Sequence, residues 1–599
     1  MKTSIIIIAC VLMLSPAVFS FDLHKNYSGD RWAYVYGTLS ASAHPLVPRV
    51  QDVFDRVLRA ADKRDNRYPK LMIIRKTGRP WAAALKDGTV ILTQKAMEFC
   101  YQAEDQTIGD ARTAFVLGHE LAHLAKDDFW HMAAFEAVQR FGSDKETDQE
   151  IIELLIKTGD IDDADRAREI IKKKELQADA YGMLYASMAG YDPRIISDAS
   201  EGKNFFREWA NQITGRLAYS DNRNLHPTPE QRTAFLLSNM KAVNNDLELF
   251  DIGVRLCQLG RYKDALAFLE TFREKYPCRE VFNNIGLINY QLAVRARCDR
   301  NRAFQYKLAG ILDTETRAMS FIMRQEQCVH AEEFQQKLQQ AIQHFRIACK
   351  KDKYYVPARV NLSSALIMAG QYSIMPGAVS KAAGVLEEAL ALNEDDPGAL
   401  SNQAIAMYLY GPSLKIDMFQ QACDALKNLI EKKPDFSDAY YNLGRVLADR
   451  KMNAAARETW EKYLNLESAG VYAEIVRETL GIQKKAENQG SSLPAFGEPP
   501  VRLGRFDNKT KKFLSGLTRH VLELDTVYGE YYCGKNLRVL VLEDTVELVE
   551  SSVKQKMNPN YARPVRTFTG YSGKKTLVYE NIAVDVLDDM VTGVMYFEN

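Results

Sequence analysis

Residues 115–124, Phe-Val-Leu-Gly-His119-Glu120-Leu-Ala-His123-Leu, form an apolar stretch that carries two histidines four residues apart. On an α-helix these histidines lie about 40° apart on one face, so both imidazole rings can reach a single metal ion. The carboxylate of Glu120 projects beside them, where it can act on a water molecule held by that metal. The stretch therefore predicts a helix with two metal ligands and a general base. Two ordinary histidines on a helix are the alternative.

A third metal ligand is expected in a second helical stretch, Glu175-Leu-Gln-Ala-Asp179-Ala-Tyr-Gly182. Zinc at a catalytic site takes three protein ligands and leaves its fourth position open, and Glu175 is the best candidate for the third ligand. Asp179 shares its helix face and can hold a zinc-bound histidine through the other ring nitrogen. Glu and Asp at this spacing are common on solvated faces. The small residues Ala178, Ala180 and Gly182 instead favour close packing against another helix.

The spacing after His123 excludes one class of zinc peptidase. Metzincins place a glycine three residues, and a third histidine six residues, after the second histidine of the motif. Those positions are Lys126 and Phe129 here, and His131 lies too far round the helix to replace the missing histidine.

Four motifs together resemble those of the gluzincin metallopeptidases that include HtpX, the CAAX prenyl endopeptidases and the soluble BepA-like periplasmic proteases. Besides the two stretches above, they are Met188-Ala-Gly190-Tyr191-Asp192-Pro193 and Leu225-His226-Pro227-Thr-Pro-Glu-Gln-Arg232. The resemblance covers roughly residues 40 to 240. It implies a zincin-like α+β domain that binds one Zn²⁺ ion through His119, His123 and Glu175 and uses Glu120 as general base.

Two further residues acquire possible roles from this resemblance. The His-Pro segment would lie close to the active site, so His226 is expected to stabilise the oxyanion or, in a resting form, to occupy the open metal position. A loop residue without function is its alternative. For Arg232, a structural salt bridge and a substrate contact are equally open. The chain has Trp81-Ala-Ala-Ala-Leu85 where the family often shows an Asn-Ala-Phe-Ala strand, which leaves the cleavage preference open.

The N-terminal residues have the pattern of a secretory signal. Met1-Lys2, the apolar run Ile5–Leu14 and a short segment ending at Ser20 predict a signal peptide over residues 1–20. A membrane anchor is the alternative, but Pro16 and an apolar run shorter than about 20 residues disfavour it. Cys10 lies too early in the apolar run for a lipoprotein site. No later stretch is apolar enough to span a bilayer, so we expect a soluble periplasmic protein without a transmembrane segment after cleavage.

The zinc metallopeptidase domain is expected over residues 21–244. Its predicted elements are an amphipathic helix over residues 45–62, strands over 71–75 and 89–93, and a turn at Asp87-Gly88. An exposed edge of this small sheet could pair with an extended substrate backbone beside the metal. The charged residues 127–172 are expected to form a surface insertion or lid between the two ligand-bearing helices.

A repeat pattern follows over residues 245–485. The pattern of small and large side chains in one helix recurs 34 residues later. Ala422 corresponds to Ala456, Leu426 to Trp460 and Leu429 to Tyr463. This period is that of tetratricopeptide repeats (TPRs), which stack pairs of antiparallel helices into a solenoid. We expect five or six pairs, ending near residue 484, with a concave face that binds peptides or partner proteins.

Residues 486–505 are rich in glycine, serine and proline and are expected to be a linker. Residues 506–599 are expected to form a small α+β domain of unassigned role, with strands at 538–542, 576–579, 582–586 and 594–597. One disulfide is conceivable among four cysteines, Cys278, Cys298, Cys328 and Cys349.

The expected fold class is therefore mainly α, with a zincin-like domain, a TPR solenoid and a small α+β domain. The net charge of zero gives no support for nucleic-acid partners. The expected function is an exported zinc metalloendopeptidase for protein and peptide substrates, with the TPR array binding clients or partners. A role in envelope protein quality control is what the resemblance implies. The alternative is a TPR assembly factor or chaperone-like scaffold with a vestigial or closed metal site. The intact HExxH and ExxxD motifs argue against it.

Overall fold

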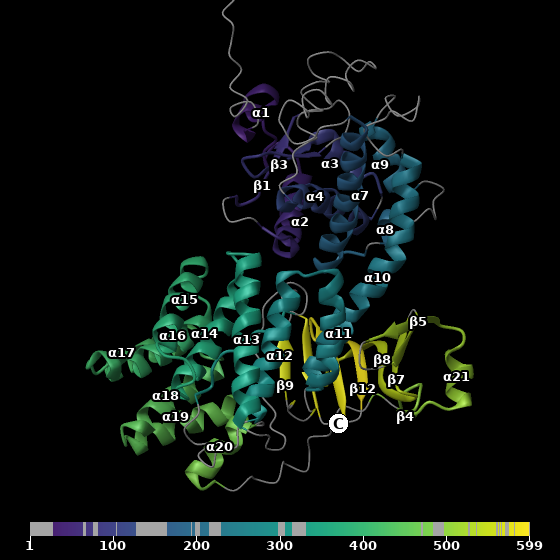
Figure 1. The fold of residues 1–599 in the computed structure, drawn as a ribbon. Coiled ribbons are helices and arrows are strands. Elements are labelled where there is room, and N and C mark those ends of the chain that lie inside the picture. Colours follow the sequence, from purple (N-terminus) through teal and green to yellow (C-terminus); the bar gives the residue numbers. More distant parts are fainter. Residues whose placement is uncertain are drawn as a thin grey trace, which may run out of the picture.

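The computed structural model describes residues 28–63, 67–75, 82–103, 105–126, 164–192, 194–197, 204–214, 229–296, 306–313, 331–468, 471–482, 496, 498–524, 528–534, 536–558, 561, 564, 566–569, 574–579 and 581–597. Helices predominate in them (Figure 1). The expected mainly α fold class is confirmed. None of the described helices is long and apolar enough to cross a bilayer. The expected signal peptide lies outside the described residues.

The N-terminal part combines helices with a small sheet. Its elements up to the histidine helix are α1 (Gly29–Tyr36), α2 (Leu46–Ala60), β1 (Lys70–Ile74), β2 (Ala82–Ala84), β3 (Thr89–Thr93), α3 (Gln94–Cys100) and α4 (Gln106–Lys126). The sheet has the order β1-β3-β2, with β1 parallel and β2 antiparallel to β3. The predicted helix and both predicted strands are thus confirmed. The apolar residues whose helical spacing predicted α2 are all buried, namely Val50, Val53, Phe54, Val57 and Leu58.

Three more helices complete this part, α7 (Ala164–Met188), α8 (Arg194–Ser197) and α9 (Phe205–Thr214). The long helix α7 packs against α4, and α2 contacts both of them. Residues 127–163, most of the expected insertion or lid, lie outside the described residues. Residues 164–172 form the first turns of α7, so this end of the stretch belongs to a ligand-bearing helix.

A single long helix, α10 (Pro229–Leu259), links the N-terminal part to the repeats (Figure 1). It packs against α7 and α9 of the N-terminal part and against α11, the next helix. The expected boundary between residues 244 and 245 falls inside this helix. The two parts of the chain are therefore joined by continuous helical backbone.

The repeats stack as antiparallel helix pairs. After α10 come α11 (Tyr262–Lys275), α12 (Arg279–Ala296), α13 (Ala331–Lys351), α14 (Val356–Gln371), α15 (Ala378–Leu392), α16 (Pro397–Tyr410), the short 3-10 helix η3 (Gly411–Leu414), α17 (Phe419–Lys432), α18 (Ser437–Asp449), α19 (Asn453–Leu466) and α20 (Val471–Leu480). The described helices make five pairs, from α10–α11 to α18–α19, and α20 closes the stack. Gly444 shows why the pattern needs small residues, because a Cβ atom there would lie 2.5 Å from the Trp460 ring.

The C-terminal part is a large, mostly antiparallel sheet with one described helix. Its elements are β4 (Gly504–Arg505), α21 (Asn508–Leu514), β5 (Thr518–Glu523), β6 (Tyr528–Cys533), β7 (Leu537–Leu542), β8 (Thr545–Lys556), β9 (Arg566–Thr569), β10 (Lys575–Val578), β11 (Ile582–Leu587) and β12 (Met590–Phe597). The strand order is β5-β6-β7-β8-β12-β11-β10-β9, and β4 pairs with β8. Gly504–Arg505, the last residues of the expected linker, thus form a strand of this sheet, and Val501 is buried in its hydrophobic core.

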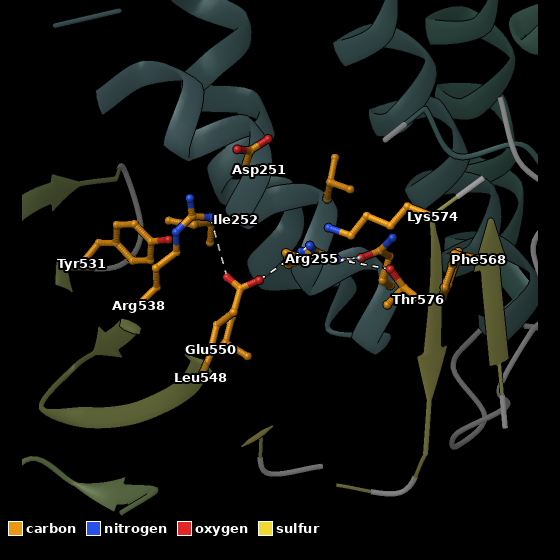
Figure 2. Close-up of a pocket in the computed structure, with 12 residues that line it drawn as sticks. Asp251, Ile252, Arg255, Tyr531, Arg538, Leu548, Glu550, Phe568, Lys574 and Thr576 are labelled. Carbon is orange, nitrogen blue, oxygen red and sulfur yellow. Dashed lines mark hydrogen bonds and ion pairs between the residues drawn. The ribbon is translucent and has the colours of Figure 1, made fainter. Parts of the chain in front are cut away.

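This sheet packs against α10 and shares a hydrophobic core with the first repeats. Arg255 of α10 lies at their contact, where its guanidinium donates to Asp585 at 2.8 and 3.2 Å. It also lies 3.6 Å from Glu550 (Figure 2). Burial opposes the charge of Asp585, but Arg255 and Lys574 outweigh it and lower the pKa of this carboxyl group. A buried ion pair therefore ties the C-terminal sheet to the helix. Among the cysteines that the structure describes, Cys278 and Cys349 are free thiols.

Candidate metal centre

Helix α4 carries the three residues of the HExxH motif and presents the two histidines toward α7. The helix is apolar around most of its surface and buries residues 113–118 and 120–124. Within this apolar surrounding, His123 and Glu120 are only 3% and 7% exposed. Polar side chains are buried in this way only where partners or ions satisfy them, so the motif needs groups from other elements.

Helix α7 supplies the expected third donor, Glu175. Nε2 of His119 lies 3.1 Å from Nε2 of His123. The two carboxylate oxygens of Glu175 lie 3.3 Å from Nε2 of His123 and 3.9 Å from Nε2 of His119. One ligand atom from each of these residues lies within 4.8 Å of the others. Two helices that are far apart in the chain thus bring three metal-ligating side chains to one point.

The donor set fits zinc. Zinc bonds to histidine nitrogen and carboxylate oxygen measure about 2.0–2.1 Å, which places tetrahedral ligand atoms roughly 3.3 Å apart. The 3.1 Å between the two histidine nitrogens and the 3.3 Å from Oε1 of Glu175 to Nε2 of His123 lie close to that value. The other oxygen of Glu175, Oε2, lies 3.9 Å from Nε2 of His119. Two nitrogens and one carboxylate oxygen, with a fourth position left over, are the donor set of a catalytic zinc site.

Asp179 fixes the orientation of His119. Its Oδ1 lies 3.0 Å from Nδ1 of His119, and it follows Glu175 by one helical turn. A carboxylate on Nδ1 keeps the ring proton there and leaves the Nε2 lone pair for a metal. Asp179 itself is completely buried. The geometry is therefore the one expected of a residue that holds a ligand in place.

Arg232 of α10 binds the two carboxylates of α7. Its guanidinium donates to Asp179 at 2.9 and 2.5 Å and lies 3.4 Å from Glu175. Burial opposes ionisation of Glu175, but its hydrogen bond with His123 and the charge of Arg232 outweigh burial and hold its pKa well below the usual value. Of the two roles left open by the sequence, the structure shows the salt bridge.

Glu120 lies on the other side of the histidine pair, next to β2. The backbone N–H of Ala84 on β2 hydrogen-bonds to its carboxyl group. The second oxygen, Oε2, is buried and has no hydrogen-bond partner within the described part of the chain. Burial raises the pKa of Glu120 above its usual value, although the two histidines oppose this. A carboxyl group with a raised pKa and a vacant acceptor atom suits a general base that takes up a proton.

Two glycines set the distance between α4 and α7. A Cβ atom on Gly182 would lie 2.8 Å from the backbone nitrogen of His119, and one on Gly118 would lie 2.8 Å from the carbonyl oxygen of Gly182. Backbone therefore meets backbone at the residue next to the first ligand. The predicted close packing at Gly182 is confirmed, whereas the sequence reading did not single out its partner Gly118.

We expect Gly182→Ala to push the helices apart and to destabilise the site by about 1–3 kcal/mol, the usual effect of overpacking. Zinc affinity measured against a competing chelator should fall with it. Gly384→Ala in α15 is the control, because a Cβ atom there meets open space and alanine favours the helix. Equal zinc affinities of the two variants would contradict this role of Gly182.

The other candidates stand as follows. His226 lies outside the described residues, so its expected role remains a prediction. Trp81 also lies outside them, whereas Ala82–Ala84 forms strand β2. Among the described strands, β2 pairs only with β3 and is an edge of the small sheet. The expected edge strand beside the histidine helix is thus present.

The comparison with known families agrees with this geometry. Residues 46–239 match Peptidase family M48. The matched range contains both helix motifs discussed above, and Arg232, and it supports a metallopeptidase domain. It ends at residue 239, within α10, and so leaves the repeats and the C-terminal sheet outside. No curated protein matches the chain.

Solved structures of TPR proteins show weak similarity to the chain. A thermophilic TPR protein from Thermus thermophilus is 15% identical, with a TM-score of 0.28, over 40% of this chain and 100% of its own. A TPR protein from Parabacteroides merdae is 13% identical, with a TM-score of 0.26, over 59% of this chain and 98% of its own.

Proposed function

We propose that this protein is a zinc-dependent metalloendopeptidase whose ion is held by His119, His123 and Glu175. The observation that carries the proposal is the convergence of these three donors beside a buried carboxylate with one oxygen that has no partner among the described residues. Zinc at such a site acts as a Lewis acid that polarises the scissile carbonyl and lowers the pKa of bound water to about 7.

Residues of the chain would carry out proton transfer, ligand positioning and substrate binding. Glu120 takes a proton from the attacking water and delivers it to the leaving amine. Asp179 and Arg232 keep His119 and Glu175 in position. The edge strand β2, which touches Glu120 through Ala84, offers backbone groups to an extended substrate. An endopeptidase needs such an arrangement because it binds the middle of a chain.

The subfamily, location and biological role belong to the same proposal. We place the chain near the HtpX and BepA-like gluzincins, in the periplasm, with a role in envelope protein quality control. We divide it into a signal peptide (1–20), a peptidase domain (21–244) and a TPR domain (245–485), which α10 joins, and a linker (486–505) whose last residues pair with the C-terminal domain (506–599). The TPR domain would bind clients or partner proteins.

The deciding experiment measures zinc and proteolysis on the same sample. We expect the purified chain to contain one zinc ion and to cleave an unfolded protein such as reduced, alkylated casein. Removal of zinc with a chelator should abolish cleavage, and added zinc should restore it. A chain that binds zinc but cleaves no unfolded protein would instead support the scaffold with a closed site.

Asp179→Ala is expected to weaken zinc binding or activity by about 10- to 100-fold, the usual loss when the partner of a metal-bound histidine is removed. Chelator competition and the casein assay measure the two effects. Asp179→Asn is the matched control, because it keeps an acceptor for Nδ1 of His119 and should lose less. If both variants behave like the wild type, Asp179 does not position the ligand.

A further inference from the structure

An extended segment of the chain, residues 306–313, runs along the inner helices of the repeats. Its sequence is Tyr-Lys-Leu-Ala-Gly-Ile-Leu-Asp, and all eight residues are buried. The segment lies between α12 and α13 in the sequence, yet it contacts α12, α14, α16 and α18 through hydrogen bonds. These are the first helices of successive pairs, which line one side of the stack.

Each of these four helices contributes an asparagine that binds the backbone of the segment. Three of them bind both groups of one residue. Asn442 accepts from the N–H of Lys307 at 2.8 Å and donates to its carbonyl at 2.9 Å. Asn361 makes the same pair with Ile311 at 2.7 and 2.8 Å.

Two more contacts complete the series. Asn284 accepts from the N–H of Asp313 at 2.9 Å and donates to its carbonyl at 2.8 Å. Asn402 accepts from the N–H of Ala309 at 3.1 Å, while the hydroxyl of Ser364 donates to the carbonyl of Ala309 at 2.6 Å. The bound residues 307, 309, 311 and 313 thus alternate along the segment and meet the helices in reverse order.

This spacing matches extended polypeptide. In an extended chain the N–H and C=O groups of one residue point to the same side and those of the next residue point away, so alternate residues face one surface. A side-chain amide has one acceptor and one donor group and pairs with both backbone groups of one residue. The four asparagines therefore recognise backbone, which every polypeptide supplies, rather than a particular set of side chains.

The two ends of the segment add side-chain contacts. The Lys307 ammonium lies 2.8 Å from Asp438 and also pairs with Glu467. Although burial opposes the charge of Lys307, these two carboxylates outweigh it and raise its pKa. At the other end, the hydroxyl of Tyr355 donates to Asp313 at 2.5 Å. A peptide that binds here is thus favoured by a basic residue at the position of Lys307 and an acidic residue at the position of Asp313.

We propose that the surface of α12, α14, α16 and α18 that carries the four asparagines, called the groove below, is a binding site for an extended segment of another polypeptide, and that residues 306–313 occupy it as a built-in competitor. The partner is an unfolded or extended protein segment with a basic residue facing Asp438 and Glu467. The inference deepens the client-binding part of the proposed function and rests on it, but it does not require a catalytic metal centre.

Fluorescence anisotropy with a labelled peptide, YKLAGILD, tests the competition in the full chain carrying Glu120→Gln, so that the peptide is not cleaved. A tethered segment competes at an effective concentration on the order of millimolar, so the wild-type groove should bind the peptide weakly. Ile311→Pro removes the N–H that Asn361 accepts. Loss of this bond should weaken self-occupancy and tighten peptide binding by about tenfold or more.

Three controls make the result specific. Adding Asn402→Ala to Ile311→Pro should reverse the gain, and the peptide YKLAGPLD should bind about tenfold or more weakly than YKLAGILD. Lys307→Ala keeps every backbone bond of the segment but removes the cation that pairs with the carboxylates of Asp438 and Glu467, so it should also weaken self-occupancy and raise peptide affinity. If circular dichroism shows that the Ile311→Pro variant does not fold, the Lys307→Ala variant tests whether the segment competes with the peptide.

Peptide affinity that is unchanged in the folded segment variants, or unaffected by Asn402→Ala, overturns the proposal. A doubled mass by light scattering without a gain in peptide affinity also overturns it, because a second copy of the chain would then fill the groove. Since binding is read without proteolysis, failure of this test and failure of the peptidase assay are separate results.

Discussion

Glu120→Gln is expected to leave zinc bound and to lower proteolysis of unfolded casein by about 100- to 10,000-fold, the usual contribution of a general base. Glutamine fills the same volume and can still accept the hydrogen bond from the Ala84 N–H. It cannot take up a proton at the position of the buried Oε2 atom. The three proposed ligands are unchanged, so metal content and catalysis should separate.

His119→Ala provides the contrast for this prediction. It removes one of the three donor atoms and should lower both zinc content and proteolysis. Measurement of zinc by atomic absorption beside the casein assay distinguishes the two variants. A Glu120→Gln protein that cleaves casein at the wild-type rate would show that another group serves as the base.

The metal centre could be predicted from sequence because helix periodicity places its residues. His119 and His123 share one face of α4, and Glu175 and Asp179 share one face of α7, in both cases through the four-residue spacing. That the two faces meet is not a local property. Small residues in α7 indicated the contact, and Gly118 opposite Gly182 shows how closely the helices approach.

Other features escaped the sequence reading because they depend on distant parts of the chain. In the C-terminal sheet, strands β4, β5, β6, β8 and β9 were not predicted. The burial of β8 shows why, since its second half is mostly exposed and carries polar side chains. The buried asparagines of the groove lie beside buried leucines of the same helices, Asn361 next to Leu362 and Asn442 next to Leu443. These asparagines recur in the first helices of successive pairs. The sequence analysis considered only apolar positions and therefore missed this recurrence.

Arg232→Met is expected to have the largest effect on stability around the metal centre. The guanidinium is buried against Asp179 and Glu175 and lies over the Phe206 ring. Its removal leaves two buried carboxylates without their cation, and breaking a buried ion pair in this way costs about 3–5 kcal/mol. Methionine fills much of the volume, so the loss reports the charge rather than a cavity. The metal-free protein should show it most clearly, because zinc itself supplies positive charge at Glu175.

Hydrogen exchange of the α4 and α7 amides measures this loss locally, which suits a long chain whose parts need not unfold in one step. Arg450→Met is the matched control, since Arg450 pairs with Asp417 on the surface of the repeats. Exposed ion pairs contribute about 0–1 kcal/mol, so that variant should exchange like the wild type. Arg232→Lys keeps the positive charge but not the bidentate hydrogen bonding to Asp179. We expect its exchange rates to lie between those of Arg232→Met and Arg450→Met. If the α7 amides exchange as slowly in Arg232→Met as in Arg450→Met, other groups hold the carboxylates of the site. The convergence of Asp179 and Glu175 on one arginine would then not be what keeps the ligands in place.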